Sequence, residues 1–193
     1  RFNCSNVKAA VACGLALDVE EEAIVQGIAA VAGVPGRFER VDEGQSFEVI
    51  VDYAHTPMGL ENILHSAREL SRKRLICLFG CGGDRDRGKR ALMGQAAENL
   101  ADLVFITSDN PRSELPEKII EDIVAGMASS AGVEIQADRR MAIAQALRAA
   151  EDGDVVVLAG KGDEGYQILA DEVIDFDDRV VARETLREIA ETR

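Results

Sequence analysis

Four stretches of the sequence combine glycine or proline with charged or amide residues, a mixture that suits the binding of a small polar molecule. The most informative of them contains Asp109-Asn110-Pro111-Arg112. Its aspartate can hold an ammonium group, its amide can both donate and accept hydrogen bonds, and its arginine can bind a carboxylate through two parallel N–H bonds. These groups complement a zwitterionic amino acid. Asp-Asn and Asn-Pro are also common in ordinary turns, so this run alone leaves both interpretations open.

Residues 80–90 form a glycine-rich stretch with a basic cluster of Arg85, Arg87, Lys89 and Arg90. The spacing of Gly83, Gly88 and Lys89 approaches that of a phosphate-binding P-loop, but Arg90 stands where that motif requires Ser or Thr to hold magnesium. We therefore reject a P-loop. Two interpretations remain. One is a turn with solvated charges; the other is a receptor in which backbone N–H groups, a helix N-terminus and an arginine bind an anion such as a carboxylate.

The other two stretches also allow a functional and a structural interpretation. In residues 160–167, glycines permit a close approach of the backbone to a ligand and Glu164 could pair with an ammonium group, but a mobile surface loop has the same composition. In residues 52–57, Asp52 could bind a ribose hydroxyl, as acidic residues at strand ends do in dinucleotide-binding folds. For His55 we favour a structural role.

The order of apolar runs and helical patterns predicts an α/β fold from residue 37 onward. Strands are expected at 47–53, 75–79, 103–107, 133–137 and 155–159, and helices at 58–70, 89–100, 116–127, 139–150 and 179–189. Strands that alternate with helices in this way form a mainly parallel, Rossmann-like sheet with helices on both faces. Each of the four stretches follows a predicted strand, and ligands bind at the carboxyl ends of such strands. We therefore expect a ligand site at that edge of the sheet.

The first 33 residues are expected to form a short helical segment that precedes this fold. An alanine-rich run predicts one helix, and Asp18 is expected to be the N-cap of a second helix. Three glutamates after Asp18 suit the first turn of that helix, because the helix dipole favours negative charge there. The turn-forming run Gly33-Val34-Pro35-Gly36 then predicts a domain boundary.

Composition and charge exclude several classes of protein. The 193 residues carry a net charge of −13 at pH 7, which disfavours a nucleic-acid partner because such a protein must neutralise phosphates. No apolar run approaches the ~20 residues that span a bilayer, and the first residues lack the order of a signal peptide. The 4 cysteines and 2 histidines lack the spacing of a zinc site, so we expect reduced thiols and no metal site. A cytoplasmic location is expected.

Taken together in chain order, the four stretches and residues 34–39 resemble the Mur ligase family, whose members are ATP-dependent, amide-forming enzymes of cell-wall synthesis. Residues 34–39, 52–57, 79–86 and 109–112 carry the resemblance, which extends over essentially the whole chain. Within the family, the run at 109–112 is typical of members that add meso-diaminopimelate to UDP-N-acetylmuramoyl-L-alanyl-D-glutamate during peptidoglycan synthesis. Members that add lysine usually lack the arginine of this run.

The resemblance implies a domain organisation and two sets of ligand contacts. Residues 1–36 would be a helical remnant of a central ATP-binding domain, and residues 37–193 the C-terminal domain that binds the incoming amino acid. The residues implied to bind meso-diaminopimelate are Arg85, Asp109, Asn110, Pro111, Arg112, Gly160 and Glu164. Those implied to lie near the nucleotide are Asn3 and Asn6 at the adenine, Arg37 at the phosphates and Asp52 at the ribose. One departure from the family pattern is Asp163, which stands where a histidine is usual.

The resemblance also implies that much of the machinery lies outside this chain. The family's P-loop, magnesium ligands, carbamylated lysine and UDP-sugar domain have no counterpart in it, so ATP, Mg²⁺ and the UDP-N-acetylmuramoyl dipeptide are expected to bind mainly elsewhere in a longer protein. The implied reaction passes through an acyl phosphate that the diaminopimelate amine attacks, and this chain would orient the amine. No catalytic residue is expected in the chain, which by itself should be inactive.

Three alternatives remain open at this point. The chain could belong to a lysine-adding Mur ligase or to one that recycles murein peptides. It could also be a non-catalytic α/β module that binds an amino acid. Arg112 argues against the lysine-adding enzyme, and a P-loop encoded immediately upstream would exclude the non-catalytic module.

Overall fold

The computed structural model describes residues 2–31 and 33–192. The chain divides into two compact units, Arg1–Val34 and Pro35–Arg193. The second unit holds all four stretches that could bind a ligand, so its fold decides how they meet. No helix in the described part of the chain is long and apolar enough to cross a membrane.

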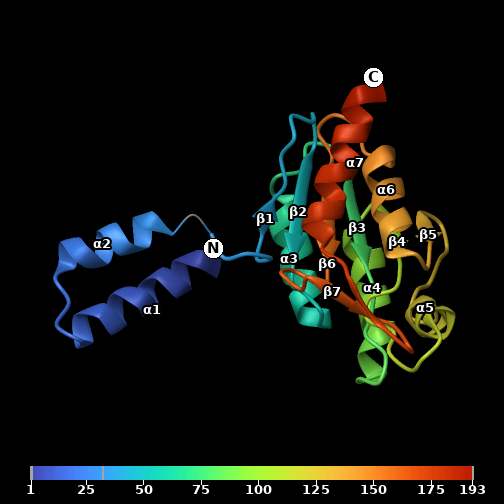
Figure 1. The fold of residues 1–193 in the computed structure, drawn as a ribbon, viewed down its shortest axis with the longest axis horizontal. Coiled ribbons are helices and arrows are strands. Elements are labelled where there is room, and N and C mark those ends of the chain that lie inside the picture. Colours follow the sequence, from blue (N-terminus) through green and yellow to red (C-terminus); the bar gives the residue numbers. More distant parts are fainter. Residues whose placement is uncertain (1, 32, 193) are drawn as a thin grey trace. The chain divides into compact units, whose positions relative to one another are not determined.

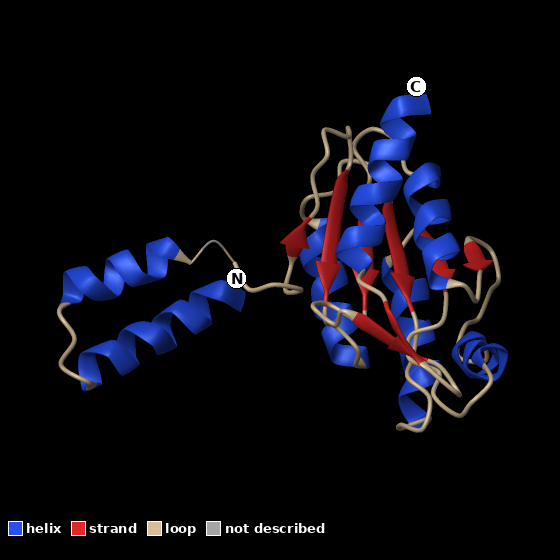
Figure 2. Ribbon diagram, viewed as in Figure 1, coloured by secondary structure: helices blue, strands red, loops and turns tan. Residues whose placement is uncertain are grey.

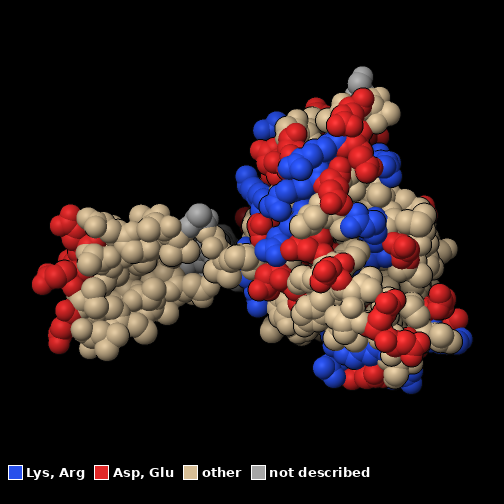
Figure 3. Space-filling view, viewed as in Figure 1, with Lys and Arg blue, Asp and Glu red and all other residues tan. Residues whose placement is uncertain are grey.

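The smaller unit is a helical hairpin of α1 (Phe2–Ala16) and α2 (Glu21–Ala30) (Figure 1). The prediction that Asp18 caps α2 is wrong, because this residue ends α1 instead. Asp18 adopts a φ of 55°, and the N–H of Val19 bonds back to the carbonyl oxygen of Gly14 at 3.0 Å, in the manner of a Schellman motif. The N-cap of α2 lies two residues beyond Asp18. Figure 3 shows a mostly uncharged surface on this unit, with acidic groups gathered at one end.

The larger unit is built on a six-stranded sheet, counted over the described residues, with the order β1-β2-β6-β3-β4-β5. The strands are β1 (Glu39–Arg40), β2 (Glu48–Asp52), β3 (Leu75–Phe79), β4 (Leu103–Ile106), β5 (Val133–Ile135) and β6 (Val155–Ala159). β1 runs antiparallel to β2, and the other neighbours run parallel. The predicted mainly parallel α/β sheet is therefore confirmed.

The strand β6 comes late in the chain but lies in the middle of the sheet, between β2 and β3. Val157 is in register with Ile50 on one side and with Cys77 on the other. Every residue of β3 and β6 is buried. Strands that are buried on both faces consist of continuous apolar residues, which explains why these two runs were recognisable in the sequence. The positions of these two strands in the sheet could not be recognised from the sequence.

Helices cover both faces of the sheet (Figure 2). They are α3 (Pro57–Arg68), α4 (Gly88–Leu100), α5 (Pro116–Val124), α6 (Arg139–Ala149) and α7 (Asp178–Thr192). Residues of α3, α4 and α5 share one apolar core with Cys77, whereas residues of α6 and α7 share a second core with Ile76. The two adjacent residues of β3 therefore point to opposite faces, as the period of a strand requires.

Three short strands were not predicted: β1 and the hairpin of β7 (Tyr166–Ile168) and β8 (Val173–Asp175). Each spans two or three residues and is only partly buried, so it lacks the apolar pattern that marks a strand in a sequence. The hairpin is held by long-range contacts instead. The Gln167 side chain, for example, donates to the carbonyl oxygen of Asp109 at 2.7 Å.

A buried ion pair joins the N-termini of α6 and α7. Arg139 Nε and Nη2 donate to the two carboxylate oxygens of Asp178 at 2.8 and 2.6 Å, and both side chains are fully buried. The same guanidinium donates to the carbonyl oxygens of Ser108 and Ala159 at 3.4 and 3.0 Å. Burial alone would lower the pKa of Arg139, but the charge and hydrogen bonds of Asp178 raise it above its ordinary value. The pair thus ties both helices to the ends of β4 and β6.

Candidate functional site

The four candidate stretches meet at the carboxyl edge of the sheet, because β2, β6, β3 and β4 are neighbours in that order. Backbone bonds and a side-chain bond link each stretch to the next. Gly160 N–H donates to the carbonyl oxygen of Asp52 at 3.0 Å, and Gly83 N–H to that of Asn110 at 2.9 Å. Asn110 Nδ2 donates to Glu164 Oε2 at 2.9 Å. The stretches therefore form one continuous region.

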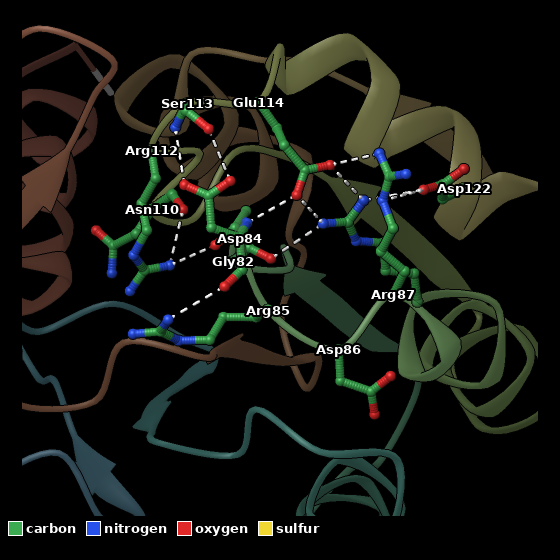
Figure 4. Close-up of polar contacts among 12 residues, drawn as sticks. Gly82, Asp84, Arg85, Asp86, Arg87, Asn110, Arg112, Ser113, Glu114 and Asp122 are labelled. Atoms are coloured by element: carbon green, nitrogen blue, oxygen red, sulfur yellow. Dashed lines mark hydrogen bonds and ion pairs between the residues drawn. The ribbon is translucent and has the colours of Figure 1, made fainter.

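The loops after β3 and β4 hold each other through reciprocal contacts, which Figure 4 shows. Asp84 accepts from the hydroxyl and the backbone N–H of Ser113 at 2.7 and 3.2 Å, while its own N–H donates to Glu114 Oε1 at 2.7 Å. A side chain at Gly83 would bring its Cβ within 1.9 Å of the carbonyl oxygen of Pro111. Only glycine permits this closeness, so the glycine-rich stretch serves loop packing at this position.

Glu114 is the centre of this contact and pairs with two of the four basic residues of the cluster. Its Oε2 accepts from Arg87 Nη2 at 2.7 Å, and its Oε1 accepts from Arg90 Nη2 at 2.8 Å. Arg90 is fully buried and also donates to Asp122 at 2.9 Å. This role of Glu114 was not predicted from the sequence, because its partners Arg90 and Arg87 lie 24 and 27 positions away along the chain. The hydrogen bond from Arg90, followed by those from Asp84 and Arg87, holds the pKa of Glu114 well below its usual range.

Three of the four basic residues of this cluster are engaged within the protein, which leaves Arg85 as the arginine available to an anion. Arg87 and Arg90 are paired with carboxylates, and Lys89 donates to the carbonyl oxygen of His55 at 2.8 Å. The Asp86 side chain accepts from the N–H of Gly88 at 2.8 Å, so a carboxylate already occupies the start of α4. Arg85 differs from the rest of the cluster. It is exposed, and its guanidinium donates a hydrogen bond to the carbonyl oxygen of Asp84 at 3.1 Å.

The depressed pKa of Glu114 makes one prediction about acid stability. An unfolded glutamate protonates near pH ~4.3, whereas Glu114 in the folded protein stays ionised to lower pH. Its stabilising effect is therefore complete above this pH and is lost as the pH falls toward the folded pKa. We expect Glu114→Gln to lower the midpoint of thermal unfolding at pH 7 and to approach the wild type as the pH falls to 3. The exposed Glu61→Gln is the control, and equal losses at both pH values would contradict the prediction.

On the other side of Asp109-Asn110-Pro111-Arg112, the buried amide of Asn110 is almost completely used within the protein. Asn110 Oδ1 accepts from Ile168 N–H at 2.9 Å and from Lys161 Nζ at 3.3 Å, which fills both of its lone pairs. One Nδ2 hydrogen goes to Glu164 Oε2, which also accepts from Lys161 Nζ at 3.1 Å. The expectation that this amide both donates to and accepts from a ligand is thus corrected. It has one donor to offer and no acceptor.

Two opposite charges at this edge remain uncommitted among the described residues. The carboxylate of Asp109 has no hydrogen-bond donor in the described structure, although Asp109 is 7% exposed. Its Oδ2 would lie 2.9 Å from a Cβ on Gly160, which has a φ of 114°, so glycine preserves the space beside this carboxylate. The half-buried Arg112 donates through Nη1 to the carbonyl oxygens of Gly83 and Asn110 at 2.9 and 3.3 Å, and forms no ion pair in the described part of the chain.

The residues expected near a nucleotide are not brought together in the same way. The carboxylate of Asp52 accepts from the backbone N–H groups of Phe38 and Ala54 at 2.8 and 2.9 Å, which is a structural role. The exposed Arg37 lies over the ring of Tyr53, 4.6 Å from its centroid.

The remaining residues of that set lie in the smaller unit. Asn6 is an exposed residue of α1, and the side chain of Asn3 lies outside the described residues. Asp163, which stands in place of the family's usual histidine, is exposed.

Comparison with known protein families identifies the domain that carries this fold and these loops as a ligase domain. Residues 36–162 match the Mur ligase glutamate ligase domain. The chain therefore belongs to the Mur ligase family. It is 55% identical over 188 residues to the UDP-N-acetylmuramoyl-L-alanyl-D-glutamate–2,6-diaminopimelate ligase of Syntrophomonas wolfei, which covers 96% of this chain and 38% of the relative. It is 54% identical over 187 residues to the ligase of the same name from Gloeobacter violaceus, with the same coverage of 96% and 38%.

Solved structures give the same relationship. A structure of UDP-N-acetylmuramoyl-L-alanyl-D-glutamate–2,6-diaminopimelate ligase superimposes with a TM-score of 0.78 at 39% identity, over 98% of this chain and 39% of that one. The UDP-N-acetylmuramate-alanine ligase of Thermotoga maritima shares the fold, with a TM-score of 0.64 at 20% identity, over 100% of this chain and 38% of that one. The chain thus spans about 38% of the length of the curated relatives that it matches.

Proposed function

We propose that this chain is the amino-acid-binding part of the ATP-dependent ligase that adds meso-diaminopimelate to UDP-N-acetylmuramoyl-L-alanyl-D-glutamate in peptidoglycan synthesis. The observation that carries the proposal is the presence of an uncommitted carboxylate, on Asp109, and an uncommitted guanidinium, on Arg112, in one loop. meso-Diaminopimelate has an ammonium and a carboxylate at each end, whereas the side chain of L-lysine ends in an ammonium alone. A guanidinium therefore has a partner in the first ligand that the second lacks.

In this proposal each group of the ligand has a named partner. The distal carboxylate binds Arg112 and the remaining N–H of Asn110, and the distal ammonium binds Asp109 and the second carboxylate oxygen of Glu164. Arg85, the exposed arginine of its cluster, binds the other carboxylate. Gly160 leaves room beside Asp109, and Pro111 restricts the backbone between the ligand residues.

The whole reaction requires groups beyond this chain. We assign residues 1–36 to the end of a central ATP-binding domain and residues 37–193 to the C-terminal domain. Bound ATP with Mg²⁺ supplies the phosphoryl group that activates the γ-carboxylate of the D-glutamyl residue. The described part of this chain contains no group of three or more His, Cys, Asp and Glu residues that could hold a metal. Its task is to hold the amine of meso-diaminopimelate in line with the activated carboxyl carbon, a contribution of proximity and orientation.

The remaining ligand assignments are part of the same proposal. The UDP-N-acetylmuramoyl dipeptide binds other domains, and Arg37 contacts the nucleotide from this chain. Arg37 is exposed and forms no ion pair in the described part of the chain, so its charge remains for a phosphate. The substrates are cytoplasmic metabolites, and we place the protein in the cytoplasm.

Calorimetry with two amino acids tests the proposal. We expect the protein to bind meso-diaminopimelate at least about tenfold more tightly than L-lysine, because L-lysine leaves Arg112 without a carboxylate partner. The full-length protein should form the amide with the UDP-linked dipeptide, and the isolated chain should show no ATP hydrolysis above a heat-killed control. A preference for L-lysine would indicate a lysine-adding enzyme. A preference for a diaminopimelate-containing tripeptide, in place of free meso-diaminopimelate, as the amine substrate would indicate peptide recycling instead.

A further inference from the structure

We propose that Lys161 is a positioning residue of the amino-acid pocket, which orients Asn110 and Glu164 for the ligand; this inference rests on the function proposed above. The Lys161 side chain is fully buried. Its Nζ lies 3.1 Å from Glu164 Oε2 and 3.3 Å from Asn110 Oδ1, and 5.6 Å from the centre of the Tyr166 ring. Its two polar partners are both residues that we assign to the ligand.

A fully buried ammonium group needs an explanation, because its removal from water is unfavourable unless other groups replace the lost hydration. An apolar side chain of similar length would fill the same volume without this cost. Lys161 follows β6 and Asn110 follows β4, and these strands are separated in the sheet by β3. The ammonium group therefore connects two loops that no sheet hydrogen bond joins directly.

The main consequence is that the amide of Asn110 has one permitted orientation. Its Oδ1 faces two donors, Lys161 Nζ and the N–H of Ile168. A reversed amide would place its own NH₂ group against both donors and would lose the bond to Glu164. The amide is therefore held so that its one remaining hydrogen is a donor, which fits a carboxylate of the ligand and rejects an ammonium.

A second consequence concerns the charges of the pocket. Lys161 and Asn110 both donate to Oε2 of Glu164, and no donor to Oε1 is recorded in the described structure. The positive charge of Lys161 offsets the negative charge of Glu164. The carboxylate of Asp109, in contrast, has no cation within ion-pair distance among the described residues. Lys161 thereby separates the roles within the pocket: Asn110 and Arg112 receive a carboxylate, and Asp109 is the principal partner of the ammonium.

Kinetics of the full-length ligase test this role with Lys161→Met, which replaces lysine by an unbranched side chain one atom shorter and removes its charge. We expect the KM for meso-diaminopimelate to rise at least about tenfold, because Asn110 loses one of the two donors that fix its amide and Glu164 loses its counter-ion. The KM values for ATP and for the UDP-linked dipeptide should stay within about twofold. The preference for meso-diaminopimelate over L-lysine should also fall, an effect that a purely structural role would not produce. The matched control is Lys118→Met, which removes an exposed lysine from a pair with Glu121 of the same i,i+3 spacing.

A second comparison separates positioning from simple charge compensation. In Glu164→Gln, the buried ammonium has lost its counter-ion, and in Lys161→Met/Glu164→Gln neither charge remains. Charge compensation alone predicts that Lys161→Met does no further harm to binding in the Glu164→Gln protein. Positioning predicts that it still weakens meso-diaminopimelate binding, because Asn110 has lost a donor. This comparison also serves if Lys161→Met alone does not fold.

The outcomes distinguish the two proposals. A wild-type protein that does not bind meso-diaminopimelate would contradict the proposed function and this inference together. A wild type that binds it, with folded Lys161→Met protein of unchanged KM and selectivity, would contradict this inference alone. Binding of meso-diaminopimelate by the double variant that is as tight as in Glu164→Gln, or tighter, would also overturn it.

Discussion

Replacement of Asp178 by alanine is expected to lower the free energy of unfolding by about 3–5 kcal/mol. The variant would leave the guanidinium of Arg139 fully buried without the carboxylate that now accepts two of its hydrogen bonds at 2.8 and 2.6 Å. The carbonyl oxygens of Ser108 and Ala159 would remain as its partners. Two neutral acceptors cannot replace the lost charge, so a large part of the cost of burying the ion would appear as lost stability.

Urea unfolding at pH 7 measures this loss, and the same two helices supply a control. Arg148 of α6 and Glu188 of α7 form a pair at 3.0 Å in which both side chains are more than half exposed. Glu188→Ala should therefore cost no more than about 1 kcal/mol. The double variant Arg139→Met/Asp178→Leu should be more stable than Asp178→Ala, because it leaves no unpaired buried charge. Equal costs for Asp178→Ala and Glu188→Ala would show that the buried pair has no special weight.

The second large effect is expected in ligand binding. Arg112→Lys should weaken the binding of meso-diaminopimelate about 10- to 100-fold, because a single ammonium cannot reproduce two parallel N–H bonds to a carboxylate. The substitution also removes the Nη1 donor that bonds the carbonyl oxygens of Gly83 and Asn110 and so helps to hold the loops after β3 and β4 together. Both losses act on the ligand that has a distal carboxylate.

Titration calorimetry with meso-diaminopimelate and with L-lysine separates these effects. The binding of L-lysine should change much less than that of meso-diaminopimelate, since L-lysine has no distal carboxylate for Arg112. Arg148→Lys, an exposed change on α6, is the control for general effects of the substitution. Unchanged affinity for meso-diaminopimelate in Arg112→Lys would show that this arginine is not a ligand residue.

The surface of the larger unit shows why charge alone could not locate the site. Basic and acidic side chains alternate along α7 in Figure 3. Arg179 and Arg183 of this helix lie within ion-pair distance of Glu39, and Arg187 pairs with Glu43 at 2.9 Å. These arginines are as prominent in the sequence as Arg85 and Arg112, but carboxylates of the protein neutralise them. Arg112 forms no ion pair in the described part of the chain, and for this reason we propose it, rather than the arginines of α7, as a ligand residue.

The sequence by itself determined the buried strands and the helices of the larger unit, together with the loops between them that could bind a ligand. The continuous apolar runs of β3 and β6 predicted buried strands at the residues where the structure has them, because a strand covered on both faces has an apolar residue at every position. The combination of motifs likewise indicated the Mur ligase family, because the motifs taken together resemble those of its members. Local patterns were sufficient for both conclusions.

Only the tertiary structure decided which side chains of these loops are available. The insertion of β6 between β2 and β3 brings Lys161 to Asn110 across 51 residues, and the pairing of β3 with β4 brings Arg90 to Glu114 across 24. These contacts fill the acceptor of Asn110 and neutralise Arg87 and Arg90, and among the described residues they leave the charges of Asp109 and Arg112 without an ion pair. A sequence pattern records the period of a strand or helix, but the partner of a charge depends on the order of the strands in the sheet, which local periodicity does not contain.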